Sequence, residues 1–228
     1  MTITDLDGIT HDIDIEHPGM TFLHVDCMEV LKALPEKTDL VAIVDPPYGG
    51  NIPGHKYIER AGGQLYKYGD RAATEKWDKA PCNEYFDMLL KKTKDQVIWG
   101  GNFFDLPPNR CFLVYRKKGF TDKWKMAMAE YAWTSFDNNA KVFEKAPQNP
   151  KRIHPTQKPV ELYEWILNLF CKNNEIILDT HAGSGSLEIA CRHTGHEVIG
   201  CEINNEYYEK ALNRINQETS QSNIYDYM

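Results

Sequence analysis

The chain has 228 residues and a mass of 26.3 kDa, enough for one sizeable core and short for two independent domains. Its 42% hydrophobic content argues against wholesale disorder, and no apolar run approaches the roughly 20 residues that span a bilayer. A net charge of -7 argues against binding nucleic acid through the whole surface. We therefore expect one cytoplasmic domain over residues 1–228, with no membrane partner, no metal and its six cysteines as buried, reduced thiols.

The N-terminal part alternates apolar runs with helical patterns, at spacings typical of a parallel α/β sheet. Thr21–Val25 is a predicted strand, and Asp26–Leu34 is a predicted short helix. Leu40–Val44 is nearly all apolar, as expected for a strand buried on both faces. This strand runs into a turn that can continue neither a strand nor a helix, Asp45-Pro46-Pro47-Tyr48.

The middle of the chain is harder to interpret. Gly49–Lys79 has no clear period and is predicted to be a long, mobile loop. A helix over Asn83–Thr93 and strands over Gln96–Trp99 and Cys111–Tyr115 follow. From Arg116 to Ile153 the pattern is irregular, basic and aromatic. Residues 111–160 hold 10 basic and 4 acidic side chains, between acidic flanks. A charge run is usually only a solvated face, so this one is weak support for phosphate contacts.

The C-terminal part returns to alternating strands and helices. Val160–Cys171 is a predicted helix with one apolar face, entered through Pro159. Strands are predicted over Glu175–Leu178 and Glu197–Cys201, with a helix around Leu187–His193 between them. A final amphipathic helix covers Asn205–Gln217.

A glycine loop over residues 179–186, Asp-Thr-His-Ala-Gly-Ser-Gly-Ser, follows one of these strands and opens a helix. Glycines let the backbone approach a ligand closely, and the first amides of a helix are free to donate. The dinucleotide-binding fingerprint fits poorly, because its third glycine would fall on Glu188. Glu202 ends the next strand, where a carboxylate can accept hydrogen bonds from a ribose diol. A nucleotide-type ligand is therefore predicted.

The turn from Asp45 to Tyr48 is the sharpest signal in the sequence. An exocyclic amine on a base is a poor nucleophile, because its lone pair is delocalised into the ring. Asp45 and the Pro46 carbonyl would accept hydrogen bonds from such an amine and hold it toward tetrahedral geometry, while Tyr48 stacks on the base. These residue types, directly after an apolar strand, favour catalysis over a merely rigid loop.

These motifs together resemble the amino-methyltransferases of DNA, in the β arrangement where the catalytic tetrapeptide precedes the glycine loop. The resemblance runs from about Phe22 to Ile215 and includes the segments Ile98–Phe104 and Ala132–Phe136. It implies a doubly wound, mostly parallel α/β sheet of the S-adenosylmethionine-dependent methyltransferase (Rossmann-like) type, with a circularly permuted motif order. It assigns catalysis to Asp45, Pro46, Pro47 and Tyr48. The resemblance further implies a set of contacts to S-adenosylmethionine: Asp26, Cys27, Asp45, His154, Thr156, Gln157, Lys158, Asp179, His181, Gly183, Ser184, Gly185, Ser186, Glu202 and Asn204.

One departure from the family pattern concerns the glycine loop. The family usually has Pro-Phe where this chain has Thr180-His181, and this difference raises the prospect of lower cofactor affinity. Within the family, Asp at the first position of the tetrapeptide usually accompanies adenine N6, so the resemblance favours adenine methylation in DNA. The alternatives are cytosine N4 or RNA as the target, and a catalytically silent DNA-binding relative. A nicotinamide dehydrogenase is a distant third, because no substrate-site signature accompanies the loop.

The basic segment over residues 103–153 is the expected target-recognition region. It is short for that role, so we expect a short site, or recognition shared between two subunits of a homodimer. Double-stranded DNA is the predicted partner, with a cognate restriction endonuclease as a further candidate. Trp124 and Tyr115 lie near the basic side chains in sequence. The residues expected to contact phosphates are Arg116, Lys117, Lys118, Lys123, Lys151 and Arg152.

Overall fold

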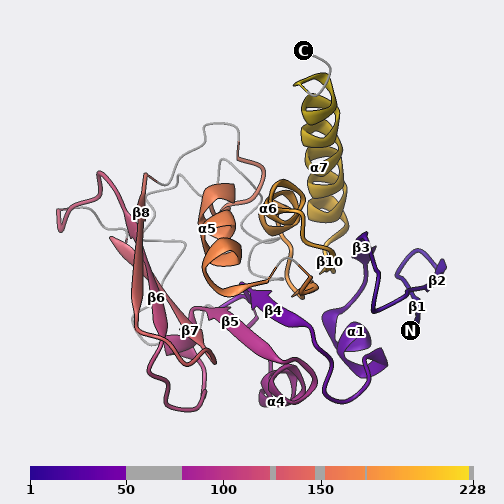
Figure 1. The fold of residues 1–228 in the computed structure, drawn as a ribbon, viewed down its shortest axis with the longest axis horizontal. Coiled ribbons are helices and arrows are strands. Elements are labelled where there is room, and N and C mark those ends of the chain that lie inside the picture. The colour runs from indigo at the N-terminus through magenta and orange to yellow at the C-terminus, as the bar shows by residue number, and fades with distance from the viewer. Residues whose placement is uncertain (50–78, 124–126, 147–151, 173, 226–228) are drawn as a thin grey trace.

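The computed structural model describes residues 1–49, 79–123, 127–146, 152–172 and 174–225. Within them, one mixed sheet of eight strands forms the centre of the molecule (Figure 1). A two-stranded hairpin, β1 (Thr2–Thr4) and β2 (Thr10–Asp12), precedes it. The strands of the large sheet in spatial order are β3 (Met20–His24), β10 (Val198–Glu202), β9 (Ile177–Asp179), β4 (Val41–Val44), β5 (Asp95–Trp99), β7 (Ala129–Thr134), β6 (Phe112–Lys117) and β8 (Lys141–Lys145).

Helices cover both faces of this sheet, which makes the fold doubly wound (Figure 1). On one face lie α1 (Cys27–Ala33) and α4 (Asn83–Lys92). On the other lie α5 (Val160–Phe170), α6 (Ser186–Thr194) and the long α7 (Asn205–Tyr225). A single 3₁₀ turn, η2 (Gly101–Phe103), follows β5. The α/β fold class predicted from the sequence is confirmed.

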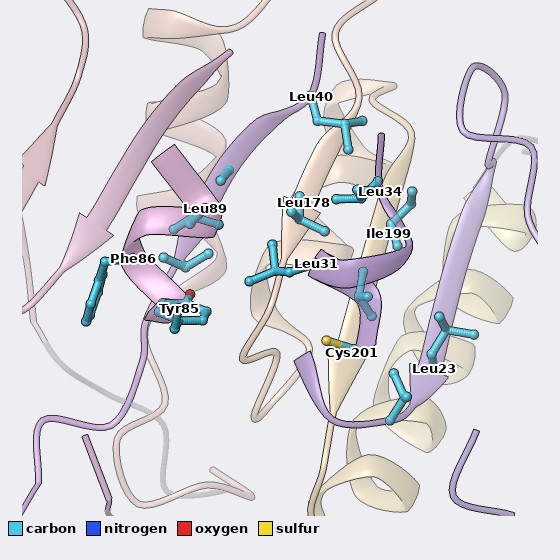
Figure 2. Packing of buried hydrophobic residues seen from close by; sticks show 14 of the residues in the cluster. Leu23, Leu31, Leu34, Leu40, Tyr85, Phe86, Leu89, Leu178, Ile199 and Cys201 are labelled. Atoms are coloured by element: carbon cyan, nitrogen blue, oxygen red, sulfur yellow. The ribbon is translucent and has the colours of Figure 1, made fainter. Parts of the chain in front are cut away.

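The position of β4 between helices on both faces of the sheet explains why its sequence is apolar throughout. Val41 and Ile43 pack with α5 and α6, while Ala42 and Val44 pack with α1 and α4, and all of these side chains are fully buried. Figure 2 shows the second of these clusters, in which leucines of α1 and α4 cover residues of β9 and β10. Burial of this kind contributes about 25 cal/mol for each Å² of apolar surface removed from water.

Strand direction determines where the functional segments meet. β3, β10, β9, β4 and β5 are mutually parallel, so their carboxyl ends lie along one edge of the sheet. β9 pairs with β10 on one side and with β4 on the other. The glycine loop after β9 is therefore flanked by Glu202 at the end of β10 and by Asp45 after β4. This edge, where loops leave parallel strands, is the usual place for ligands in α/β folds.

The interpretation of residues 116–153 as irregular was wrong. β7 lies between β5 and β6 and is antiparallel to both, and β8 pairs with β6 in parallel. β8 alternates partly buried and exposed residues and has a lysine at each end, as befits an edge strand. The hairpin β1–β2 was also not predicted. The expected loop over Gly49–Lys79 lies, apart from its two ends, outside the described residues.

The structure also bears on the predictions about membrane spans and cysteines. Among the described residues, no helix combines the length and apolarity that crossing a membrane requires. All six cysteines are free thiols, as expected, but Cys82 is exposed, and Cys27 and Cys171 are only partly buried.

Candidate active site

A cavity of about 460 Å³ opens at the carboxyl edge of the parallel strands. It brings together the turn after β4, the glycine loop after β9 and the segment before α5, which are far apart in the sequence. All four residues predicted to be catalytic line it: Asp45, Pro46, Pro47 and Tyr48. Of the residues predicted to bind the cofactor, those that line it are Asp26, Cys27, Asp45, His154, Thr156, Gln157, Lys158, His181, Gly183, Ser184, Ser186 and Glu202.

Both carboxylate oxygens of Asp45 have partners within the site. Oδ1 accepts a hydrogen bond of 2.9 Å from the Tyr48 hydroxyl, and Oδ2 accepts one from the Lys158 ammonium. Burial raises the pKa of Asp45, while the charge of Lys158 opposes that rise. The ring of Tyr48 packs at 5.0 Å from the ring of Phe103, with 30° between their planes. The turn from Asp45 to Tyr48 is therefore held by contacts on the side chains of both of these residues.

The glycine loop is shaped by residues in the left-handed region. Gly183 and Gly185 have φ of 54° and 69°. The Gly183 amide donates to Glu202 Oε2 at 2.9 Å, and the Asn204 amide donates to Oε1 at 2.8 Å. Burial raises the pKa of Glu202, whereas these amides lower it. Glu202 is thus fixed at the cavity wall beside the loop, at the position predicted for a ribose-binding carboxylate.

Thr180 and His181, the departures from the family pattern, form a hydrogen-bonded chain that reaches into α4. The Tyr85 hydroxyl lies 2.6 Å from Thr180 Oγ1, which lies 2.9 Å from His181 Nδ1. His181 Nε2 lies 3.9 Å from the Cys27 sulfur. Burial lowers the pKa of His181 to about 4, so the ring is neutral at pH 7. This imidazole therefore brings no positive charge to the cavity.

The segment before α5 folds back on itself. His154 Nδ1 lies 3.1 Å from the Thr156 hydroxyl, and the Ile153 amide donates to Gln157 Oε1 at 2.9 Å. Burial, with a smaller contribution from the nearby charge of Lys158, lowers the pKa of His154 to about 3. The carbonyl of Lys158 accepts a hydrogen bond from Ser186, which ties this segment to the start of α6.

Three residues predicted to bind the cofactor do not line the cavity. Asp179 is buried, and its Oδ1 accepts the His181 amide at 3.0 Å, so it supports the loop from beneath. Gly185 is the N-cap of α6 and packs against Ile215, 3.0 Å from where a Cβ would stand. Asn204 accepts the Tyr207 amide at 3.1 Å at the start of α7. All three shape the walls of the site.

Sequence reasoning missed several residues of the cavity. Glu130 comes from β7, a strand that was not predicted, and it contacts both Lys158 and Lys117. Tyr85 lies on the apolar face of α4, and the spacing of apolar residues in that helix would predict only a core position for it. Tyr163 of α5 and Tyr207 of α7 also line the cavity. Only the tertiary fold brings these helix and strand positions to the site.

The residues expected to contact DNA lie in different environments. Arg116, Lys118 and Lys123 are exposed, and Arg116 pairs with Glu144 at 2.7 Å. Lys117 has 11% of its side chain exposed and pairs with Glu130 at 2.6 Å. Arg152 is partly buried and donates to the Pro155 carbonyl at 3.4 Å. Tyr115 is buried within the sheet, whereas Lys151 and Trp124 lie outside the described residues.

Known proteins are similar to this chain over different shares of its length. YubD of Escherichia coli (strain K12), provisionally named a methylase, is 29% identical over 211 residues, 85% of this chain and 89% of its own length. The type II methyltransferase M.HpaI of Haemophilus parainfluenzae is 41% identical over 68 residues, 30% of this chain and only 22% of that protein.

Two solved structures share the fold. The complex of M1.HpyAVI with SAM has a TM-score of 0.56 at 20% identity, covering 86% of this chain and 99% of that one. The cytosine-N4-specific DNA methyltransferase PvuII has a TM-score of 0.57 at 14% identity, with 89% and 90% covered. The N6/N4 family model described as DNA methylase matches residues 76–213, more than half of the chain. The chain belongs to this DNA methylase family.

Proposed function

We propose that the protein transfers a methyl group from S-adenosylmethionine to the exocyclic N6 of adenine in double-stranded DNA. The observation that carries this proposal is that Asp45 and Tyr48 line the same cavity as the glycine loop and Glu202. A site that must hold a base and a methyl donor in contact needs this convergence. Membership of the DNA methylase family supports DNA as the substrate.

The residues of the cavity fit S-adenosylmethionine. Glu202 is held by two backbone amides beside the loop, in the position to bind a ribose diol, and Asp26 and His181 line the same end. A cavity of about 460 Å³ lies in the range typical of sites for cofactors and small molecules. His154, Gln157 and Lys158 line the wall formed by the segment before α5. When bound, S-adenosylmethionine supplies a methyl group on a positively charged sulfur.

The chain's own residues would prepare the accepting nitrogen. Asp45 Oδ1 and the Pro46 carbonyl accept hydrogen bonds from the amine of a base flipped out of the duplex. Tyr48 turns from Asp45 to stack on that base, which releases Oδ1 for the amine. S-adenosylmethionine held by Glu202 and the segment before α5 would supply the methyl group to this nitrogen, and the proton that the nitrogen then sheds would pass to water. No covalent intermediate with the protein is needed.

The choice of adenine over cytosine rests on Asp45 as the first residue of the tetrapeptide. Cytosine N4 is the second candidate, because it is also a planar exocyclic amine that the same acceptors would hold. The solved PvuII methyltransferase, which is cytosine-N4-specific by name, shows that this fold accommodates that reaction.

Methyl transfer from labelled S-adenosylmethionine to long unmethylated DNA tests the proposal, because such DNA contains every short recognition sequence. We expect Asp45→Ala and Tyr48→Ala to reduce incorporation by about 100-fold or more, while Asp87→Ala, at an exposed position on α4, serves as the control. Nuclease digestion with mass spectrometry then identifies the product base. Incorporation by Asp45→Ala at the wild-type rate would refute the catalytic assignment, and N4-methylcytosine as the product would refute adenine.

A further inference from the structure

A row of four alternating charges leads from the catalytic carboxylate into the second half of the sheet. The Lys158 ammonium contacts Asp45 Oδ2 and lies 3.2 Å from Glu130 Oε2. Glu130 Oε1 in turn lies 2.6 Å from the ammonium of Lys117. The four residues come from the turn after β4, the segment before α5, β7 and β6. Sequence reasoning had assigned Lys158 to the cofactor and Lys117 to DNA.

Lys158 is the most enclosed member of this row, with 3% of its side chain exposed. A buried ammonium is costly unless acceptors surround it, and Asp45 and Glu130 are such acceptors. Its Nζ also lies 5.1 Å from the centroid of the Trp99 ring, a favourable place for a cation. Its carbonyl is bound by Ser186 at 2.9 Å. Contacts therefore hold Lys158 both at its backbone carbonyl and at its side-chain ammonium.

The two oxygens of Asp45 consequently have different roles. Lys158 holds Oδ2, whereas the partner of Oδ1 is the hydroxyl of Tyr48, an aromatic residue that can leave to stack on a base. A carboxylate is purely an acceptor at both oxygens, whereas protonation turns one of them into an O–H donor that cannot serve the Lys158 ammonium or a base amine as well. Burial works against that charged form by raising the pKa of Asp45, and Lys158 is the first of the groups that lower it.

We propose that Lys158 is a positioning residue for methyl transfer, which keeps Asp45 as a carboxylate with Oδ1 directed at the target nitrogen and is itself held by Glu130 and Lys117. The inference rests on the proposed function, because it assigns Asp45 the role of acceptor for the base amine. It replaces the predicted role of Lys158 in cofactor binding with a role in positioning the Asp45 carboxylate. Among the described residues, the titratable groups that interact with Asp45 or Lys158 are Tyr48, Glu130, His154, Tyr163 and Asp179, and Lys117 acts on Glu130.

Substitution of Lys158 separates positioning from cofactor binding. We expect Lys158→Met to bind S-adenosylmethionine within about 3-fold of wild type by calorimetry, yet to transfer the methyl group about 100-fold more slowly at saturating cofactor and DNA. Removing the positive charge should also move the acid limb of the pH–rate profile to higher pH, so that the deficit shrinks as the pH rises. Lys158→Arg keeps the charge and should recover part of the rate.

Glu130→Gln provides a second variant with the opposite expectation. The negative charge of Glu130 raises the pKa of Asp45, so its removal should shift the acid limb to lower pH while the rate falls because Lys158 is less well held. Lys94→Met is the matched control, since Lys94 also pairs across the fold, with Glu175, but 42% of its side chain is exposed. This control should leave both the rate and the profile unchanged.

A titration of the free protein gives a reading that does not depend on activity. With ¹³C-labelled aspartate, the carboxyl signal absent from Asp45→Asn reports the ionisation of Asp45 in wild type, Lys158→Met and Glu130→Gln. Circular dichroism establishes that each variant is folded, and Glu130→Gln carries the test if Lys158→Met does not fold. The inference is supported if the Asp45 titration rises in Lys158→Met and falls in Glu130→Gln.

Contrary results fall into two kinds. Weakened cofactor binding at an unchanged saturated rate in Lys158→Met, or an Asp45 titration that moves in neither variant, would overturn the positioning role. Absence of any methyl transfer to DNA by wild type would instead overturn the proposed function, and the titration would still report on the charge row.

Discussion

A Cβ at Gly100 would stand 2.2 Å from Cε1 of the Tyr48 ring, so the ring lies directly against the glycine backbone. Gly100 follows β5 with a φ of 69°. The next residue, Gly101, leaves room for Trp133 in the same way, because a Cβ added at Gly101 would lie 2.4 Å from the Cβ of Trp133. The absence of side chains at Gly100 and Gly101 therefore allows the Tyr48 ring and strand β7 to pack directly against the backbone after β5.

Gly100→Ala should consequently displace Tyr48. We expect methyl transfer to fall by about 10-fold or more, because the added Cβ pushes on the turn that carries both Asp45 and Tyr48. Gly195→Ala is a matched control, since Gly195 also has a positive φ, 75°, but no atom lies within 4 Å of its added Cβ. Both variants should lose about 1 kcal/mol of stability from the backbone conformation. Equal activity of the two variants in the labelled-methyl assay would disprove this role of Gly100.

Thr180 and Tyr85 offer a test of the loop's departure from the family pattern. Tyr85 is buried, and its hydroxyl lies 2.6 Å from Thr180 Oγ1. Thr180→Val should cost about 1–3 kcal/mol in urea unfolding, because it leaves that buried hydroxyl without its hydrogen-bond partner. Adding Tyr85→Phe to this variant should restore part of the lost stability, because the unpartnered hydroxyl is then gone while His181 Nδ1 still lacks the Thr180 hydroxyl. A double variant less stable than Thr180→Val would contradict the proposed pairing.

Glu188 makes stability depend on pH. It is fully buried in α6, and neither carboxyl oxygen has a hydrogen-bond partner among the described residues. Gly200 leaves room for this group, because a Cβ there would lie 2.3 Å from Glu188 Oε1. Burial raises the pKa of Glu188 from 4.5 to about 8. Between these values the folded protein keeps a proton that the unfolded chain has lost, so stability falls as the pH rises through this window.

Glu188→Gln removes this proton without changing the shape of the side chain much. Between pH 5 and pH 8, wild type should therefore lose more stability than Glu188→Gln, by an amount on the order of a few kcal/mol. Urea unfolding at the two pH values measures the difference, with Glu206→Gln as an exposed control. Parallel losses in wild type and Glu188→Gln would mean that Glu188 is ionised in the folded protein.

The exposed lysines at the end of β6 test the DNA-facing surface. Lys118 and Lys123 are exposed, whereas Lys117 points to Glu130. Lys118→Ala with Lys123→Ala should weaken DNA binding and reduce the slope of log affinity against log salt by about 1 for each lysine that contacts a phosphate. The control pair, Lys32→Ala with Lys91→Ala, changes charge equally on α1 and α4. An identical salt slope for both pairs would place the DNA elsewhere.

Much of the fold followed from local patterns in the sequence. β4 is apolar at four consecutive positions because helices cover both of its faces, and a strand of that kind is visible without any tertiary information. The helices α5 and α6 begin at a proline and after a glycine, which are local signals as well. The order of the parallel strands then brought the catalytic turn and the glycine loop together, as the motifs implied.

The parts that were missed depend on contacts between distant segments. β7 and β8 carry charged side chains beside apolar ones, so their sequences resemble a solvated loop until the sheet edge is known. Glu130 is one such charge, and its partners Lys117 and Lys158 lie 13 and 28 positions away in the chain. The motif before α5 located Lys158 at the site, but only the tertiary structure shows that its ammonium meets Asp45.

A crystal structure of the protein with S-adenosylmethionine would show whether one cavity holds both the methyl donor and the target base. We expect the ribose at Glu202 and the sulfur-bound methyl carbon facing Asp45 Oδ1 and the Pro46 carbonyl, with room between them for one nitrogen atom at roughly 3–3.5 Å from the carbon. A methyl group turned away from Asp45, or a cofactor bound outside this cavity, would contradict it.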